Sequence, residues 1–211
     1  MARPSLGFAY AVNTARQPSR ERGFTLVELM VVVMIVGVLS ILAVVGFRKL
    51  VGESRGAEAV YMVNAIKVAQ ESYHAETGSY ANLSPSLCAS TTCSALYPQA
   101  SISATLGDTK VGWGVACGAA CNSGMDWSML PVHVQGGVMY GYSTVAGPAG
   151  STISFGSITW PSGYSINVPS GATTADWFAI TGVGDEDMDT VPAVVFGSSF
   201  SNDLLVMNEG N

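Results

Sequence analysis

Charged side chains are scarce in this chain. Asp, Glu, Lys and Arg make up only 11% of its 211 residues, while hydrophobic residues make up 48%. Soluble proteins typically contain roughly 25% charged residues. A disordered chain is excluded, because disorder requires few apolar residues and many charges. The composition also does not favour an ordinary cytosolic enzyme.

Basic residues are almost missing from the distal two thirds of the chain. After Lys67 the only base is Lys110, whereas eleven acids follow from Glu71 onward, which gives this region a formal charge of −10. Nucleic-acid binding depends largely on cationic groups that neutralise phosphates. The distal region is therefore predicted not to bind nucleic acid.

Catalytic motifs are also lacking. The two histidines, His74 and His133, make neither a triad nor a metal cluster by themselves. No G-x-S-x-G elbow is present, and the glycines at 112 and 114 lack the third glycine and following helix of a nucleotide fingerprint. We therefore expect a protein that is not an enzyme. Four tryptophans allow a sugar-binding surface but are predicted to fill the core: Trp113, Trp127, Trp160 and Trp177.

Proline is absent between Phe24 and Gly78, so one helix is predicted from Phe24 to about Thr77. Within it, residues 29–47 are 19 consecutive uncharged residues, a run long enough to cross a bilayer. From Ala57 onward the pattern becomes amphipathic. Its apolar residues recur at spacings of three and four: Ala59, Met62, Ile66, Ala69 and Tyr73.

The residues before the apolar run are polar and end in a basic cluster, as in a leader segment. A conventional secretory signal is not predicted, because the run is too long and lacks a small-x-small cleavage site. Glu28 lies just inside the edge of the run, where a carboxylate calls for a partner. Cleavage after Gly23 would create an α-amino group on Phe24 that can serve as this partner.

The segment Arg22-Gly23-Phe24-Thr25-Leu26-Val27-Glu28, followed by the apolar run, resembles the prepilin signature of type IV pilins and of the related pseudopilins of type II secretion. Residues 71–80 are similar to the end of the long helix in major pilins. The resemblance implies that a membrane prepilin peptidase cuts between Gly23 and Phe24, and that Phe24 is then N-methylated. It also implies that Glu28 complements the N-terminal amine of an adjacent subunit during filament assembly.

The expected organisation follows from this resemblance and from the pattern of the distal residues. Residues 1–23 form a leader that is removed, residues 24–56 a transmembrane and filament-core helix, and residues 57–211 a globular head. We expect an α+β fold in which the long helix packs on an antiparallel sheet. A connecting loop over residues 78–106 is expected between the helix and the strands of this sheet. Short β-prone stretches predict the strands: 111–117, 132–135, 138–145, 153–160, 164–168, 177–183 and 191–196.

The four cysteines form two close pairs, Cys88 with Cys93 and Cys117 with Cys121. If the distal region is exported, an even cysteine count predicts two disulfides, for which three connectivities are possible. A four-thiolate zinc site is the alternative, and it needs a reducing compartment.

An acidic segment lies between two predicted strands. Asp185, Asp187 and Asp189 stand at alternate positions and could supply oxygen ligands to one Ca²⁺ ion. The segment is not an EF-hand, because Thr190 occupies the place of the turn glycine. A plain, solvated acidic loop is the alternative, and no cofactor is expected to be required.

These features together predict a structural subunit of an extracellular type IV pilus, with a role in adhesion or motility. The precursor is expected in the inner membrane and the mature chain in the filament at the cell surface. Expected partners are identical or related pilin subunits, the prepilin peptidase and the inner-membrane assembly machinery. Two alternatives remain: a type II secretion pseudopilin that acts in protein export, and a singly anchored periplasmic binding module.

Overall fold

The computed structural model describes most of the chain after the predicted leader. The described residues are 23–98, 109–114, 116–152, 160, 164–166, 168, 174–185 and 191–208. The chain divides into two compact units, one ending at Val44 and one beginning at Val45. Each unit is described by itself.

The predicted long helix is confirmed as α1, Leu26–Thr77, which begins two residues later than expected. Its end follows from the glycine after it. Gly78 adopts a φ of +78°, and its N–H donates to the carbonyl of His74 at 2.8 Å. Glycine is favoured in this left-handed conformation, which terminates helices by satisfying one of their last carbonyls.

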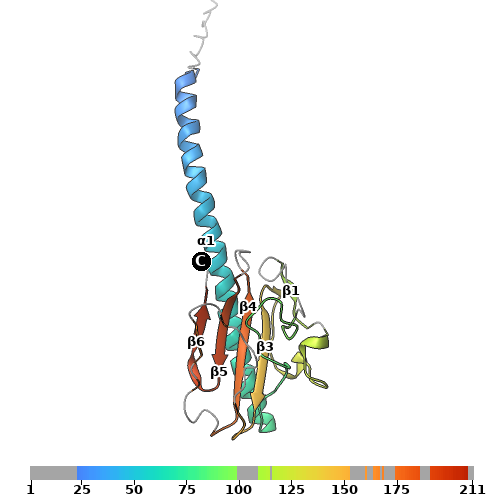
Figure 1. The fold of residues 1–211 in the computed structure, drawn as a ribbon. Helices are drawn as coiled ribbons and strands as arrows, with labels where there is room; N and C mark the ends of the chain where they lie inside the picture. The colour runs from blue at the N-terminus through green and yellow to red at the C-terminus, as the bar shows by residue number, and fades with distance from the viewer. Residues whose placement is uncertain are drawn as a thin grey trace, which may run out of the picture. The chain divides into compact units, whose positions relative to one another are not determined.

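A four-stranded antiparallel sheet forms the main part of the second unit, with its strands side by side in chain order (Figure 1). Its strands are β3 (Gly141–Gly147), β4 (Trp177–Gly184), β5 (Ala193–Ser198) and β6 (Ser201–Met207). A two-stranded sheet pairs β1 (Val111–Gly112) with β2 (Gly137–Val138). Two short 3₁₀ helices, Gly118–Ala120 and Trp127–Met129, lie between β1 and β2. The predicted α+β class is confirmed.

The C-terminal part of α1 packs on one face of the four-stranded sheet (Figure 1). The amphipathic pattern predicts this contact correctly: Ala59, Met62, Ile66 and Ala69 are buried, and Tyr73 is partly buried. They share one core with Phe178 and Ile180 of β4. Full burial of a large apolar side chain stabilises a fold by about 1.5–3 kcal/mol, so this face contributes much of the stability of the head.

The opposite face of the sheet is covered by the segment that follows α1. Leu87 and Leu96 of this segment pack with Val183 and Phe196 in a second core. Both faces of the sheet are thus covered, and all eight residues of β4 are buried. Such a strand shows no polar alternation in its sequence.

Several predicted strands need correction. Residues 132–135 form no strand, because Pro131 precedes them and Gly136 follows with a φ of +102°. Of the described residues in the strand predicted at 111–117, only Val111–Gly112 form a strand, and residue 115 lies outside the described part. The strand predicted at 138–145 is divided between β2 and β3. β6 was not predicted.

The other predicted strands near the C-terminus have mixed outcomes. Those at 177–183 and 191–196 are confirmed as β4 and β5, although β5 begins only at Ala193. The stretch 153–159 lies outside the described residues, and residues 160, 164–166 and 168 belong to no strand. In the predicted connecting loop, residues 78–98 contain only one isolated bridge, between Tyr97 and Tyr142, and residues 99–106 lie outside the described part.

Candidate functional site

The predicted processing site lies at the start of the described chain. Gly23, Phe24 and Thr25 precede α1 in a non-helical conformation. The Phe24 side chain is 85% exposed, and Gly23 has open space around the position of its missing Cβ. The peptide bond between Gly23 and Phe24 is therefore unobstructed by the described part of the chain. Residues 1–22 of the predicted leader lie outside that part.

Glu28 takes part in a reciprocal cap at the beginning of α1. Its Oε2 accepts hydrogen bonds from the backbone N of Thr25 at 3.0 Å and from Thr25 Oγ1 at 2.9 Å. The backbone N of Glu28 in turn donates to Thr25 Oγ1 at 3.2 Å. This is a capping box, which satisfies two N–H groups that have no partner inside the helix.

The cap fixes the predicted assembly carboxylate at the end of the helix where cleavage would create the new amine. The helix macrodipole also favours a negative charge in this first turn. The sequence analysis identified Glu28 but missed Thr25. The T-x-x-E spacing directly before an apolar run was the available signal.

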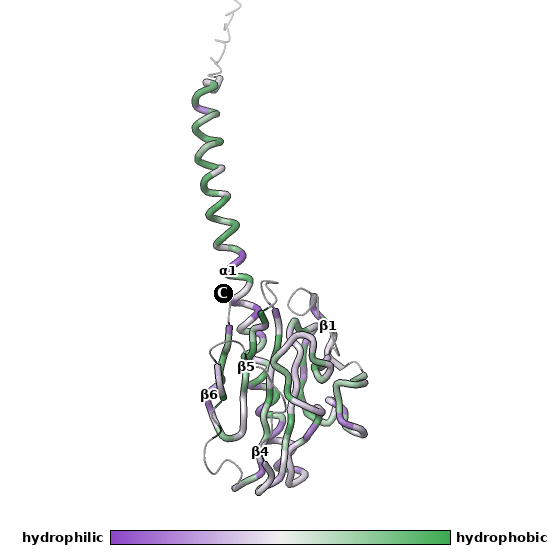
Figure 2. The backbone as a smooth tube through the Cα atoms, viewed as in Figure 1, coloured by the Kyte–Doolittle hydropathy of each residue, from purple (hydrophilic) through white to green (hydrophobic). Residues whose placement is uncertain are grey.

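The first part of α1 is apolar around its whole circumference (Figure 2). Every large apolar side chain from Leu26 to Leu50 is more than half exposed, from 51% at Val31 to 75% at Leu26. By length and composition α1 can cross a membrane. An apolar surface of this extent on a protein marks contact with a membrane or with other proteins.

In the second unit, the four cysteines form two disulfides. Cys88 is bonded to Cys93, and Cys117 to Cys121. This is one of the three connectivities that the sequence left open, and it confirms the prediction of disulfides over that of a zinc site. The first disulfide closes the segment that covers the sheet, where Cys88 is buried.

The tryptophans pack mainly in the interior. Trp127 and Trp177 are buried, and Trp113 and Trp160 are partly buried against the two cores. Rings of Trp113 and Trp127 meet edge to face at 5.4 Å. This arrangement confirms the prediction that the tryptophans fill the core.

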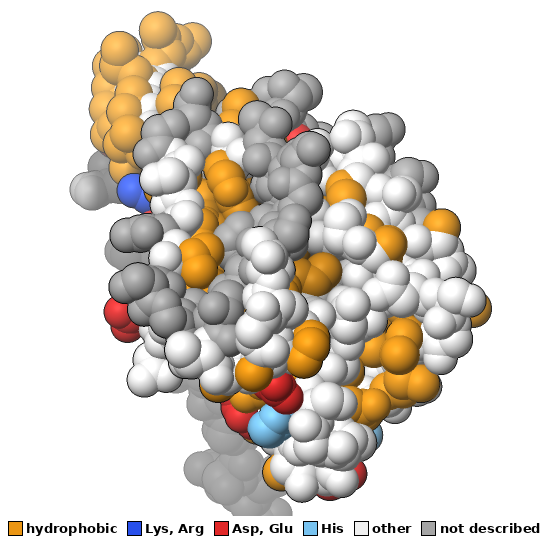
Figure 3. Space-filling model, turned by 60° about the horizontal axis from the view of Figure 1, so that its bottom comes forward, with side chains coloured by type: hydrophobic (Ala, Val, Ile, Leu, Met, Phe, Trp, Pro, Cys, Tyr) orange, Lys and Arg blue, Asp and Glu red, His pale blue; other side chains and the backbone are white. Residues whose placement is uncertain are grey.

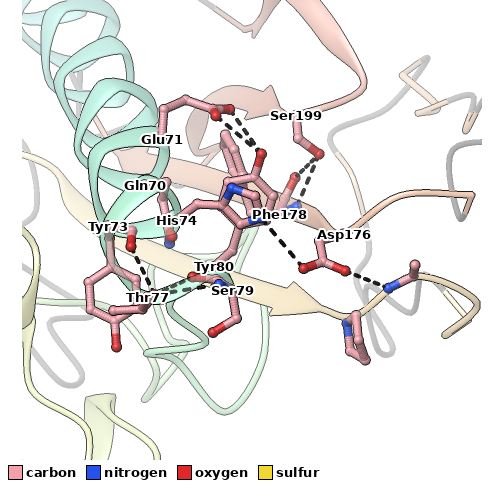
Figure 4. A network of polar contacts seen from close by, with 12 residues as sticks. Gln70, Glu71, Tyr73, His74, Thr77, Ser79, Tyr80, Asp176, Phe178 and Ser199 are labelled. Atoms are coloured by element: carbon pink, nitrogen blue, oxygen red, sulfur yellow. Dashed lines mark hydrogen bonds and ion pairs between the residues drawn. The ribbon is translucent and has the colours of Figure 1, made fainter.

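The two histidines differ in their surroundings. His133 is exposed, whereas His74 belongs to a polar network at the end of α1 (Figure 4). His74 Nε2 lies 3.5 Å from Asp176 Oδ2, and its ring stacks on Tyr80 at 4.3 Å. The Tyr80 hydroxyl donates to the carboxylate of Glu71, with both oxygens at 3.2 Å. This network connects the last turns of α1 with the residues that precede β4.

Burial and the nearby Glu71 carboxylate change the acidity of Tyr80. Loss of hydration is the main cause that raises its pKa to about 12, and the charge of Glu71 adds to the shift. Within the described ranges, no three metal-binding side chains come together. The network joins the end of α1 to Asp176 through an ion pair, a ring contact and hydrogen bonds.

The predicted calcium ligands are only partly described. Asp185 directly follows β4, while Asp187 and Asp189 lie outside the described residues. Calcium binding by this segment stays a prediction. Few Lys or Arg side chains are visible on the face of the head that Figure 3 shows, in keeping with the acidic charge of the distal region.

Comparison with known proteins finds similarity over parts of the chain. Residues 18–44 match the prokaryotic N-terminal methylation motif. The type IV major pilin protein PilA of Myxococcus xanthus (strain DK1622) is 38% identical over 71 residues, which are 34% of this chain and 32% of that protein. The type IV major fimbrial protein FimA of Dichelobacter nodosus is 40% identical over 50 residues, 24% of this chain and 31% of that protein.

The matched part thus spans about a third of the length of these curated relatives. The methylation motif at residues 18–44 contains the processing site, the capping box and the apolar part of α1 up to Val44. The distal head, with its two disulfides and four-stranded sheet, lies beyond this motif. Over the matched stretches the chain is similar to type IV pilins, as the sequence predicts.

Proposed function

We propose that this chain is a structural subunit of an extracellular type IV pilus filament. The observation that carries the proposal is the part of α1 that follows Glu28. Its large apolar side chains are exposed on every side of the helix, and Glu28 itself belongs to the N-terminal capping box. Such a helix requires an apolar environment at each stage. The bilayer supplies it for the precursor, and equivalent helices of other subunits supply it in the filament.

The proposed path begins with the precursor in the inner membrane. A prepilin peptidase removes residues 1–23, and Phe24 is N-methylated. The assembly machinery then extracts the mature chain, guided by attraction between Glu28 and the Phe24 amine of a neighbouring subunit. An ammonium and a carboxylate attract each other far more strongly in an apolar environment than in water.

Support for a pilin rather than an enzyme comes from the relatives, which are named as major pilins and fimbrial proteins. The motif at residues 18–44 supports the processing step. In the head, the disulfides favour an oxidising compartment outside the cytoplasm. The filament is proposed to act in adhesion or motility at the cell surface.

Two measurements test the proposal. Mass analysis of the mature N-terminus should find a methylated Phe24, whereas a chain that retains residues 1–23 in its working form would contradict the assignment. Imaging of an epitope-tagged chain should find it along surface filaments. A processed chain that forms no surface filament, and whose loss abolishes protein export, would identify a type II secretion pseudopilin. An unprocessed, anchored chain would identify a periplasmic binding module.

A further inference from the structure

A short segment of the head, residues 110–114, packs on the aromatic part of the first core and is here called the strap. It contains β1 and Trp113. The Trp113 ring meets the rings of Tyr97, Trp127 and Tyr142 edge to face, with centroid distances of 5.0, 5.4 and 5.9 Å. These three side chains are at most 2% exposed, whereas Trp113 is only partly buried. Trp113 is therefore the outward member of this aromatic group.

Two polar atoms of the buried rings have no hydrogen-bond partner in the described part of the chain. They are Trp127 Nε1 and the Tyr142 hydroxyl. Buried polar groups without partners are rare in native proteins and destabilise the folded chain. Trp113 packs against both rings, but an indole offers no hydrogen-bond acceptor. The strap thus covers the apolar surface of these rings and leaves their polar atoms unsatisfied.

A carboxylate from α1 lies close to the Tyr142 hydroxyl. Burial, and then the charge of Glu58, raise the pKa of this hydroxyl well above its usual value, so it stays protonated and can donate. Glu58 Oε1 accepts a hydrogen bond from the backbone N of Met139 at 2.7 Å. Its Oε2 lies 3.3 Å from Lys110 Nζ of the strap. The region under the strap therefore combines aromatic rings with two neutral donors and one acceptor.

The described attachments of the strap are weak. β1 pairs with β2 through two residue pairs only. The side chain of Lys110 is 59% exposed, and exposed ion pairs contribute little to stability. The backbone N of Gly114 donates to the Tyr97 hydroxyl at 2.9 Å. Little free energy is therefore needed to detach the strap from the head.

A glycine stands on each side of Trp113. Gly112 and Gly114 are both exposed, and neither has an atom within 4 Å of the position of its missing Cβ. Gly114 has a φ of +90°, a conformation that favours glycine. Small residues that can absorb changes in φ and ψ are common at the hinges of loops that open and close. The two glycines can therefore let the Trp113 ring swing outward.

We propose that the strap is a lid over a binding site for a hexose ring, and that Trp113 occupies this site while the lid is closed. With the lid open, the sugar ring replaces the Trp113 ring against Tyr97 and Trp127. Its oxygens accept hydrogen bonds from Trp127 Nε1 and the Tyr142 hydroxyl, and one of its hydroxyls donates to Glu58. The proposal concerns the head alone and does not depend on the proposed function.

The groups under the strap fit a sugar better than other ring-sized ligands. A hexose has C–H faces that pack on aromatic rings and a rim of hydroxyls that donate and accept. A purely aromatic ligand would leave the two polar atoms unsatisfied, as Trp113 does. An anionic ligand would be repelled by Glu58 and by the formal charge of −10 in the distal region. Aromatic walls with a few convergent polar groups are typical of small-molecule sites.

Titration of the full-length chain with three methyl hexosides tests the proposal. The probes are methyl β-glucopyranoside, methyl β-galactopyranoside and methyl α-mannopyranoside, and binding is followed by saturation-transfer NMR. The detergent must lack a sugar headgroup, because such a headgroup would compete for the site. Trp113→Ala removes the side chain that occupies the site. It should bind at least one probe about tenfold more tightly than the unmodified chain, since a site that is rarely open binds in proportion to its open fraction.

Trp160→Ala is the matched control for this titration. Trp160 is another partly buried tryptophan, but it packs against the second core. Its removal should not increase hexoside binding. Absence of binding of all three probes to Trp113→Ala, or an equal gain in Trp160→Ala, would overturn the proposal.

Tyr142→Phe separates a binding role from a structural one. It removes only a hydroxyl without a partner, so the unfolding temperature should not fall. Combined with Trp113→Ala, it should weaken hexoside binding about fivefold, the effect of one lost hydrogen bond. Tyr61→Phe, at an exposed position of α1, is the control and should leave binding unchanged. Unchanged binding in the Tyr142 variant would overturn the placement of the site.

Lys110→Gln keeps every ring of the core and serves if Trp113→Ala does not fold. Loss of the ion pair with Glu58 should favour the open lid and tighten binding of the same hexosides by about two- to fivefold. Equal binding by Lys110→Gln and the unmodified chain would overturn the role of the strap as a lid. None of these outcomes bears on the proposed function, which depends on α1.

Discussion

The side-chain amide of Gln70 forms a pair of hydrogen bonds with the backbone of Ala81. Gln70 Nε2 donates to the carbonyl of Ala81 at 2.8 Å, and Gln70 Oε1 accepts from the N–H of Ala81 at 2.9 Å. Nε2 also lies 3.1 Å from Thr144 Oγ1 of β3. One fully buried side chain thus joins the helix, the segment that follows it and the sheet.

Replacement of this glutamine should destabilise the head. Gln70→Ala leaves the buried N–H and carbonyl of Ala81 without these bonds, and each unsatisfied group costs about 1–3 kcal/mol. We expect the free energy of unfolding to fall by about 3 kcal/mol in urea titrations of the detergent-solubilised chain. Ser72→Ala, on the exposed side of α1, is the control and should change it by less than about 0.5 kcal/mol. A Gln70 variant as stable as this control would contradict the account.

Close contact between α1 and the sheet depends on glycine at position 197. A Cβ atom there would lie 2.8 Å from Val63 Cγ1 and 2.9 Å from Leu204 Cδ2. Gly197→Ala should therefore force α1 and β5 apart and reduce stability by about 1–3 kcal/mol. Gly112→Ala is the matched strand control, because no atom lies within 4 Å of its added Cβ. Thermal unfolding should separate the two variants, and Val63→Ala should partly rescue Gly197→Ala.

The sequence predicts those parts of the fold whose signal is local. The absence of proline, the apolar periodicity and Gly78 predict both ends of α1 to within two residues. Continuous apolar stretches predict β4 and β5. β6 was missed because it opens with Ser201, Asn202 and Asp203, which are typical of turns. The burial of Gln70 depends on Ala81 and Thr144, which meet it only after folding.

In the candidate site, too, the features with a local sequence signal could be predicted and those that depend on folding could not. Gly23, Phe24 and Glu28 are adjacent in sequence, so a linear motif identifies them. The disulfide connectivity was left open, since close spacing alone does not decide which cysteines meet.

Tyr80 should titrate at unusually high pH. Its pKa is raised from 10.0 to about 12, first by burial and then by the charge of Glu71. Because the folded state holds this proton more tightly than the unfolded state, the stabilisation is complete below pH 10 and is lost as the pH rises through about 12. The ultraviolet absorbance of the phenolate, compared between the unmodified chain and Tyr80→Phe, measures the titration.

A second variant separates the two causes of the Tyr80 shift. Glu71→Gln removes the neighbouring charge but leaves the ring as buried as before. The pKa of Tyr80 should therefore fall only part of the way toward 10.0. A return to the ordinary value would show that Glu71, rather than burial, dominates the shift.

Loss of the Cys88–Cys93 disulfide should weaken the cover over the second face of the sheet. The bond closes a short loop, for which chain entropy predicts a contribution of about 2 kcal/mol. Cys88→Ala combined with Cys93→Ala should lower the urea midpoint accordingly. Ser90→Ala, at an exposed position within the same loop, is the control. An unchanged midpoint in the double variant would show that packing of the segment, and not the cross-link, holds it in place.

The two roles of Glu28 can be separated by two substitutions. Glu28→Ala removes both the negative charge and the hydrogen bonds to Thr25, whereas Glu28→Gln removes the charge but keeps an oxygen that can accept them. Both variants should still be processed, because the Gly23–Phe24 bond is unchanged. If attraction to a neighbour's amine drives assembly, both should produce few filaments. Normal filaments from Glu28→Gln, with poor assembly of Glu28→Ala, would assign the function of this residue to the cap instead.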